Sequence, residues 1–256
     1  SRFQRALAMP YFEMGTGEVA FKQGADFQYG IYKGTAKQKI GAKTEEIFIE
    51  NLANLDAKAF SVFSDDKTIT PIQRAYRLGQ GFNVLNLRAR NLSRRQILNN
   101  SVEVFNSSYF VNKLMPTLYF SLGNAGGRSH DYVQSLRNQG YGLNEGDLNS
   151  YMLASTAISN GFLSYGSAII RYLLKGKQTA KPVSYQKSDY ILYWPEFTTY
   201  ANQDNISIAI ESAYKRYQLP TLLFGYESSV YGKRASGEWL AGIQFYRGKS
   251  NYLLYL

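Results

Sequence analysis

The strongest helical pattern in this chain spans residues 145–175, with the sequence EGDLNSYMLASTAISNGFLSYGSAIIRYLLK. Apolar side chains recur there at helical spacing, which is typical of a helix with one buried face. Asn144 is suited to cap its beginning and Gly176 to end it, because glycine adopts the left-handed conformation readily. Gly161 and Gly166 interrupt the pattern, so we expect a break or a close contact there.

Downstream of this helix, the sequence becomes rich in strand signals. Residues 177–188 are polar and basic and predict an exposed linker. The segments after them alternate in polarity, contain many tyrosines and are separated by turn residues, which favours an antiparallel meander. The expected strands are residues 190–194, 206–210, 221–226, 239–246 and 252–256. An amphipathic helix over residues 205–217 is the alternative to the second of these strands.

Upstream of the helix, the expected elements are shorter. Pro71 after Thr70 predicts the beginning of a helix, and Pro116 is expected to end the helical pattern that precedes it. Residues 44–56 fit either a helix or a strand. The other expected elements are two strands at 18–21 and 27–32, a helix at 71–79, a strand at 82–87, a helix at 93–112, a strand or loop at 118–120 and a helix at 129–138.

These elements predict an α+β fold. A helical middle region, residues 93–175, packs with an antiparallel, tyrosine-rich C-terminal sheet and with short N-terminal strands. A chain of 256 residues suits a single domain, residues 1–256. The alternative is a division into a mixed α/β region, residues 1–176, and a β-rich region, residues 177–256.

Composition narrows the function classes. The chain has a net charge of +10, which attracts polyanions, and 45% hydrophobic residues, which is unlike a disordered chain. It has no cysteine and one histidine, which excludes disulfides, thiol nucleophiles and zinc fingers. No cofactor is expected, although a carboxylate site for Mg²⁺ or Ca²⁺ stays open. No segment is long and apolar enough to span a membrane.

The basic charge is concentrated in one stretch. Residues 67–102 contain no acidic residue, whereas six acids lie within residues 45–66. Arginine side chains bind phosphates and stack on bases, so this stretch predicts sequence-independent contacts with nucleic acid. The alternative is that these arginines pair with the acidic segment. The predicted nucleic-acid-binding residues are Arg74, Arg77, Arg88, Arg90, Arg94, Arg95, Lys175 and Lys177.

A glycine-rich loop is the second candidate site. Gly126, Gly127 and Arg128 are predicted to bind an anion through consecutive backbone amides, with an ordinary loop as the alternative. His130 beside Asp131 suggests a general base, but no nucleophile motif supports it, and a structural or surface histidine is the favoured interpretation. The acids at 45–50 and 145–147 are explained as helix first-turn residues. No catalytic residue and no metal ligand is predicted.

These observations favour a non-enzymatic assembly protein that binds nucleic acid through a basic face, as a nucleoprotein subunit or a virion component. The apolar C-terminal segment, residues 252–256, is expected to be a strand inserted in a sheet, and a homo-oligomer or larger assembly is expected. Cytoplasm or virion is the expected location. A secreted or surface adhesin or toxin, and a metal-dependent enzyme acting on a polyanion, are the two alternatives.

Overall fold

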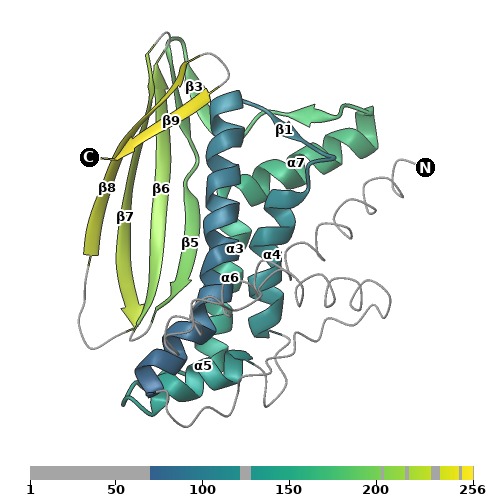
Figure 1. Ribbon diagram of the computed structural model, residues 1–256. Coiled ribbons are helices and arrows are strands. Elements are labelled where there is room, and N and C mark those ends of the chain that lie inside the picture. The colour runs from purple at the N-terminus through teal and green to yellow at the C-terminus, as the bar shows by residue number, and fades with distance from the viewer. Residues whose placement is uncertain are drawn as a thin grey trace.

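The computed structural model describes residues 70–121, 128–202, 205–216, 219–231, 237–247 and 250–255. Over these residues the protein has the predicted α+β fold, with helices gathered beside a large antiparallel sheet (Figure 1). The expected N-terminal strands and the segment 44–56 lie outside the described residues. No helix in the described ranges is long and apolar enough to cross a membrane.

The first described helix corrects three predictions. Residues 71–99 form one continuous helix. Its predicted beginning at Pro71 is confirmed, whereas the end expected at 79 and the strand expected at 82–87 were wrong. The helix expected at 93–112 is divided between the end of this helix and a second helix that begins at Ser108. Leu78, Phe82, Leu85 and Ala89 are buried at intervals of three and four residues, which is the helical period. The alternation over residues 82–87 matched a strand only because it is short enough to fit both periods. The helices are α3 (Pro71–Asn99), α4 (Ser108–Ser121), α5 (Arg128–Arg137), α6 (Glu145–Ile158) and α7 (Asn160–Lys175).

Pro116 does not end a helix. It lies inside α4, which continues to Ser121, so the strand or loop expected at 118–120 was also wrong. Proline removes one backbone donor, but both Pro116 and Thr117 are buried, and this packing outweighs the lost hydrogen bond. The helix expected at 129–138 is confirmed as α5.

The predicted helix 145–175 is divided into α6 and α7 at Ser159, which has extended backbone angles. The sequence predicted a break or a close contact at Gly161 and Gly166. The close contact is confirmed at Gly161, which packs against the Tyr109 ring, whereas the break lies two residues earlier, where Ser159 contacts the sheet. The Ser159 hydroxyl donates to the carbonyl of Phe197. The predicted ends are confirmed: the Asn144 side chain accepts a hydrogen bond from the Asp147 amide, and Gly176 has a positive φ of 68°.

The main sheet has seven strands. Six of them follow one another in the order β3-β4-β6-β7-β8-β9. The seventh, β5, pairs with a different part of β6 from the part that pairs with β4. The expected linker 177–188 contains β2 and β3, so that prediction was wrong. The strand expected at 206–210 is confirmed as part of β6, and its alternative, a helix over residues 205–217, is not formed. β5 was not predicted. The strands are β1 (Val102–Glu103), β2 (Thr179–Ala180), β3 (Ser184–Lys187), β4 (Tyr190–Tyr193), β5 (Glu196–Ala201), β6 (Ile206–Arg216), β7 (Thr221–Tyr231), β8 (Gly237–Arg247) and β9 (Ser250–Tyr255).

The helix α3 makes the most extensive contact of any helix with the main sheet (Figure 1). Its C-terminal half contributes Ile97 to a small core with Tyr193, Ala213 and Leu223 from three strands. Its N-terminal half packs with α5 and α6 in a larger core that also includes Ala201 of β5. We call the side of the sheet that contacts α3 the inner sheet face and the opposite side the outer sheet face.

Two glycines of α7 give a matched test of this packing. A Cβ atom at Gly161 would lie 2.4 Å from the Tyr109 ring, whereas a Cβ atom at Gly166 would meet nothing within 4 Å. Gly161→Ala should lower the free energy of unfolding by about 1–3 kcal/mol, because the ring must move. Gly166→Ala should raise it by about 0.5–1 kcal/mol, because alanine favours helix. Urea denaturation measures both, and equal effects would contradict this packing.

Candidate functional site

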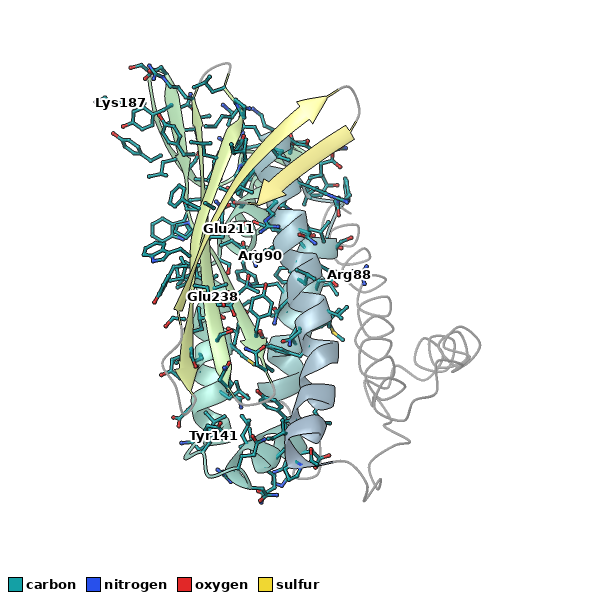
Figure 2. The ribbon with its side chains drawn as sticks, turned by 60° about the vertical axis from the view of Figure 1, so that its left-hand side comes forward. Arg88, Arg90, Tyr141, Lys187, Glu211 and Glu238 are labelled. Atoms are coloured by element: carbon teal, nitrogen blue, oxygen red, sulfur yellow. The ribbon has the colours of Figure 1, made fainter. Side chains whose placement is uncertain are left out.

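Two arginines of α3 meet one glutamate of β6 in the interior. The side-chain Nε atoms of Arg90 and Arg94 donate to opposite oxygens of the Glu211 carboxylate, at 3.2 and 2.6 Å. A terminal nitrogen of each arginine also donates to Glu211 Oε2, and Arg90 donates to the Tyr200 hydroxyl at 3.0 Å. Figure 2 shows Arg90 and Glu211 facing each other between α3 and the sheet.

This cluster changes the interpretation of the basic stretch. Arg90 and Arg94 are buried and hold Glu211, so they are not part of a surface that could contact phosphates, and the prediction for these two residues was wrong. Ion pairing was the alternative expected from the sequence, but with the acidic segment 45–66. The observed partner instead follows Arg90 by 121 residues and lies on a strand.

The electrostatics of Glu211 follow from this geometry. Burial alone would raise the pKa of its carboxyl group. The hydrogen bonds from Arg94 and the charges of Arg90 and Arg94 outweigh burial and hold this pKa below its ordinary value. The carboxylate therefore stays charged in the folded protein, and its charge neutralises one of the two guanidinium groups.

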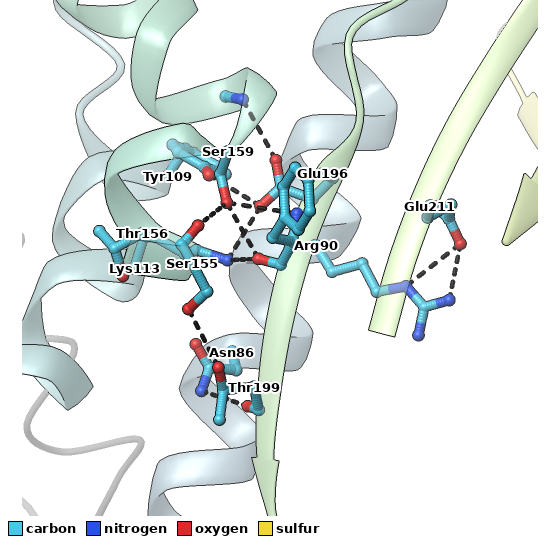
Figure 3. A network of polar contacts seen from close by, with 12 residues as sticks. Asn86, Arg90, Tyr109, Lys113, Ser155, Thr156, Ser159, Glu196, Thr199 and Glu211 are labelled. Carbon is cyan, nitrogen blue, oxygen red and sulfur yellow. Dashed lines mark hydrogen bonds and ion pairs between the residues drawn. The ribbon is translucent and has the colours of Figure 1, made fainter. Parts of the chain in front are cut away.

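A second buried cluster joins α4, α7 and β5 (Figure 3). Glu196 Oε1 accepts hydrogen bonds from the Tyr109 hydroxyl at 2.8 Å and from Lys113 Nζ at 3.1 Å. Its other oxygen accepts from the backbone amide of Gly161 at 3.1 Å. Lys113 also donates to the carbonyl of Phe197. One carboxylate thus fastens two helices to the strand that the sequence analysis missed.

Burial also perturbs the groups around Glu196. It lowers the pKa of Lys113, although the charge of Glu196 opposes the change. Burial and the Glu196 charge together raise the pKa of Tyr109 well above its ordinary value. A lysine and a tyrosine with perturbed pKa values are candidates for proton transfer. Both are fully buried and bonded to Glu196, however, so their shifts are explained by a structural role.

The remaining predicted residues are spread over the molecule. Arg88 and Arg95 are exposed on the side of α3 away from the sheet, with Arg88 labelled in Figure 2. Lys175 and Lys177 are exposed at the end of α7, so the structure does not gather the predicted residues into one face. Arg74 and Arg77 lie in the first turns of α3, and nothing is described of their side chains. Gly126 and Gly127 lie outside the described residues, and Arg128 is the first residue of α5.

The acidic residues and the histidine form no metal site in the part of the chain that the structure describes, where no group of three or more such side chains could hold an ion. Asp131 lies in the first turn of α5, as expected for an acid near a helix N-terminus. His130 lies beside it and is partly buried.

The outer sheet face is the feature that the sequence analysis described least well. Directly paired residues share a face, and one row of them crosses five strands without a polar residue. This row consists of Tyr185, Leu192, Tyr214, Leu222 and Ile243. A second row contains Ile210, Tyr226 and Trp239, and between them Phe224 is exposed. Side chains project from this face into solvent in Figure 2.

Aromatic contacts order this face. The ring centroids of Tyr226 and Trp239 are 4.8 Å apart, and those of Tyr190 and Tyr214 are 5.9 Å apart. Even so, 82% of the Trp239 surface is exposed. The alternation in the sequence predicted which residues share a face, but it could not show against which face the described helices pack.

Glu211→Gln is expected to lower the free energy of unfolding by about 3–5 kcal/mol at neutral pH, because two buried guanidinium groups lose their counter-charge. Asp189→Asn is the matched control, since Asp189 pairs with Arg216 at 3.4 Å on the surface, and should change this free energy by less than about 1 kcal/mol. Guanidinium chloride unfolding measures both.

The pH dependence gives an independent check. The folded pKa of Glu211 lies below its ordinary value of 4.5, so its stabilisation is complete above pH 4.5 and is lost as the pH falls through the folded pKa. The acid-side decrease in stability should therefore be shallower in Glu211→Gln than in the unmodified protein. Parallel curves would show that Glu211 is not held as a charged carboxylate.

No protein-family model, no curated protein and no solved structure matches this chain. The functional interpretation therefore depends on the geometry of its own residues.

Proposed function

We propose that this chain is a non-enzymatic assembly protein that associates with further copies of itself through the outer sheet face. The observation that carries the proposal is the apolar row across five strands together with the exposed Trp239. Contiguous apolar surfaces of this kind are uncommon on monomeric proteins and mark interaction sites. Tyrosine, tryptophan and phenylalanine are also the residues that protein interfaces favour.

A second copy is the occupant that fits this face best. Sheet faces pack on sheet faces, because two sheets with the same twist interdigitate their side chains across about 10 Å. The outer face presents such a surface to an identical partner. The buried polar clusters around Glu196 and Glu211 support the same view, since they hold α3 and α4 on the inner side of the sheet.

Charge supports self-association through this face in particular. Each chain carries a net charge of +10, so two copies repel one another, and this repulsion is smallest where uncharged surfaces meet and the like charges stay far apart. The two apolar rows contain no charged side chain, and the basic residues Lys187 and Arg216 lie at the end of the face, in register with Tyr190. Association through these rows leaves those charges in water.

Nucleic-acid binding is the second part of the proposal, on a reduced set of residues. Arg88 and Arg95 are both exposed and lie seven positions apart, which places them on the same side of α3, with the exposed Asn91 between them. Two arginines at this spacing suit phosphate contacts along a strand of nucleic acid. An assembly protein with this activity would act in the cytoplasm or in a virion.

Replacing Trp239 and Phe224 by serine should convert an oligomer into a monomer at micromolar concentration, with a dissociation constant raised at least about tenfold by the lost apolar contact. Sedimentation equilibrium measures it. Leu87→Ser is the matched control, because Leu87 is a similarly exposed apolar residue on α3.

Raising the salt concentration should strengthen association, because it screens the repulsion between like charges. An unmodified protein that is monomeric at high concentration would refute the proposal.

Nucleic-acid binding should respond to salt in the opposite direction. Binding of a fluorescent single-stranded oligonucleotide should weaken as the salt concentration rises. The Arg88→Ala and Arg95→Ala double variant should make the plot of log binding constant against log salt concentration less steep, by the amount expected for the loss of about two phosphate contacts. Fluorescence anisotropy gives the slope. Lys187→Ala with Arg216→Ala is a control of equal charge on the sheet. If both pairs change the slope equally, the effect is one of net charge and α3 is not the binding surface.

A further inference from the structure

The helix α7 presents an apolar side to solvent. Leu163, Ile170 and Leu174 are separated by seven and four residues, so they lie along one line of the helix. The exposed fractions of Ile170 and Leu174 are 59% and 74%. Surface helices usually carry charged residues on this side.

The buried side of the same helix combines apolar packing of Tyr165, Ala168 and Tyr172 with polar contacts. It includes Asn160, whose side-chain amide donates to the carbonyls of Val183 and Trp194. The Ser164 hydroxyl donates to the Asn160 side chain, and the Tyr165 hydroxyl donates to the carbonyl of Val104. These hydrogen bonds fix the rotation of α7, so its apolar line cannot turn inward without breaking them.

Basic residues surround the C-terminal end of this line. Lys175, Lys177 and Lys181 are all exposed and lie within seven residues of one another, where α7 ends and β2 begins. Arg171 is partly exposed one turn earlier. Glu103, which pairs with Thr179 across β1 and β2, is an exposed acid beside them. The cluster therefore keeps a clear excess of positive charge next to aliphatic side chains.

We propose that α7 docks on an anionic lipid bilayer, lying in the plane of the membrane surface. Ile170 and Leu174 enter the region between the lipid headgroups and acyl chains, and the three lysines contact lipid phosphates. The charge of the lysines is complementary to that of an anionic membrane. The aliphatic neighbours favour lipid over nucleic acid, because leucine and isoleucine cannot stack on bases as aromatic residues do. The surface is distinct from the outer sheet face.

Vesicle co-sedimentation tests this proposal with the full chain. Binding is expected to phosphatidylcholine vesicles that contain about one-third phosphatidylglycerol and to be much weaker to phosphatidylcholine alone. Ile170→Ser with Leu174→Ser should lower the partition coefficient at least about tenfold. Lys175→Gln, Lys177→Gln and Lys181→Gln together should lower it on the order of 100-fold, at about fivefold for each lysine. All five side chains are exposed, so the variants should fold, and circular dichroism checks this.

Matched variants separate this site from general effects. Arg88→Gln, Arg95→Gln and Lys187→Gln together remove the same charge elsewhere, and Leu222→Ser with Phe224→Ser removes exposed apolar side chains from the outer sheet face. Both should bind vesicles nearly as well as the unmodified chain. If either reduces binding as strongly as the α7 variants do, the proposal fails. It also fails if the lysine variant loses oligonucleotide binding and keeps vesicle binding.

A labelled cysteine gives the position of α7 directly. The chain has no cysteine of its own, so Ile170→Cys can carry a single environment-sensitive fluorophore. Its emission should shift to the blue with anionic vesicles, whereas the same label at Leu87→Cys on α3 should not shift. Equal shifts at both positions, or no shift at residue 170, would overturn the proposal.

Discussion

The pairing of Glu211 with Arg90 and Arg94 is the constraint on which the arrangement of helices and sheet depends. Two guanidinium groups and one carboxylate leave water together, and each is costly to bury unless the others are in place. The cluster ties the C-terminal half of α3 to the middle of β6. Buried ion pairs contribute little to net stability compared with apolar packing, but they disfavour every arrangement that leaves a charge unpaired. Their effect here is to select one position of α3 on the sheet.

The second cluster extends this principle to the rest of the helices. Glu196 receives donors from α4 and from the beginning of α7, so β5 is held by polar contacts on a carboxylate that water does not reach. Hydroxyls and amides continue the pattern along β5: the Asn86 side chain donates to the carbonyl of Thr199. The contact between helices and sheet is thus polar over much of its length, and apolar cores lie at its two ends.

Apolar side chains also lie on the surface. The outer sheet face and the outward side of α7 carry exposed leucine, isoleucine and aromatic residues, whereas their inward sides combine apolar packing with hydrogen-bonding groups. In both places the rotation of the element is fixed by bonds made inside the molecule, at Glu211 for the sheet and at Asn160 for α7. The two surfaces proposed to bind partners therefore have the same physical origin.

The sequence by itself determined the features that depend on near neighbours. The caps of Asn144 and Gly176 and the alternation of four paired strands, β6 to β9, were predictable because turns, caps and period-two patterns are local. The helical period of α3 was also present but was mistaken for a strand over six residues. What the arginines do depends on packing between segments that are distant in the sequence. The local sequence around an arginine does not indicate whether its side chain will face water or a carboxylate. The partner here, Glu211, lies more than 100 residues from Arg90 and Arg94. Likewise, alternation showed that two faces of the sheet differ, but the packing of α3 decided which of them remained open to a partner.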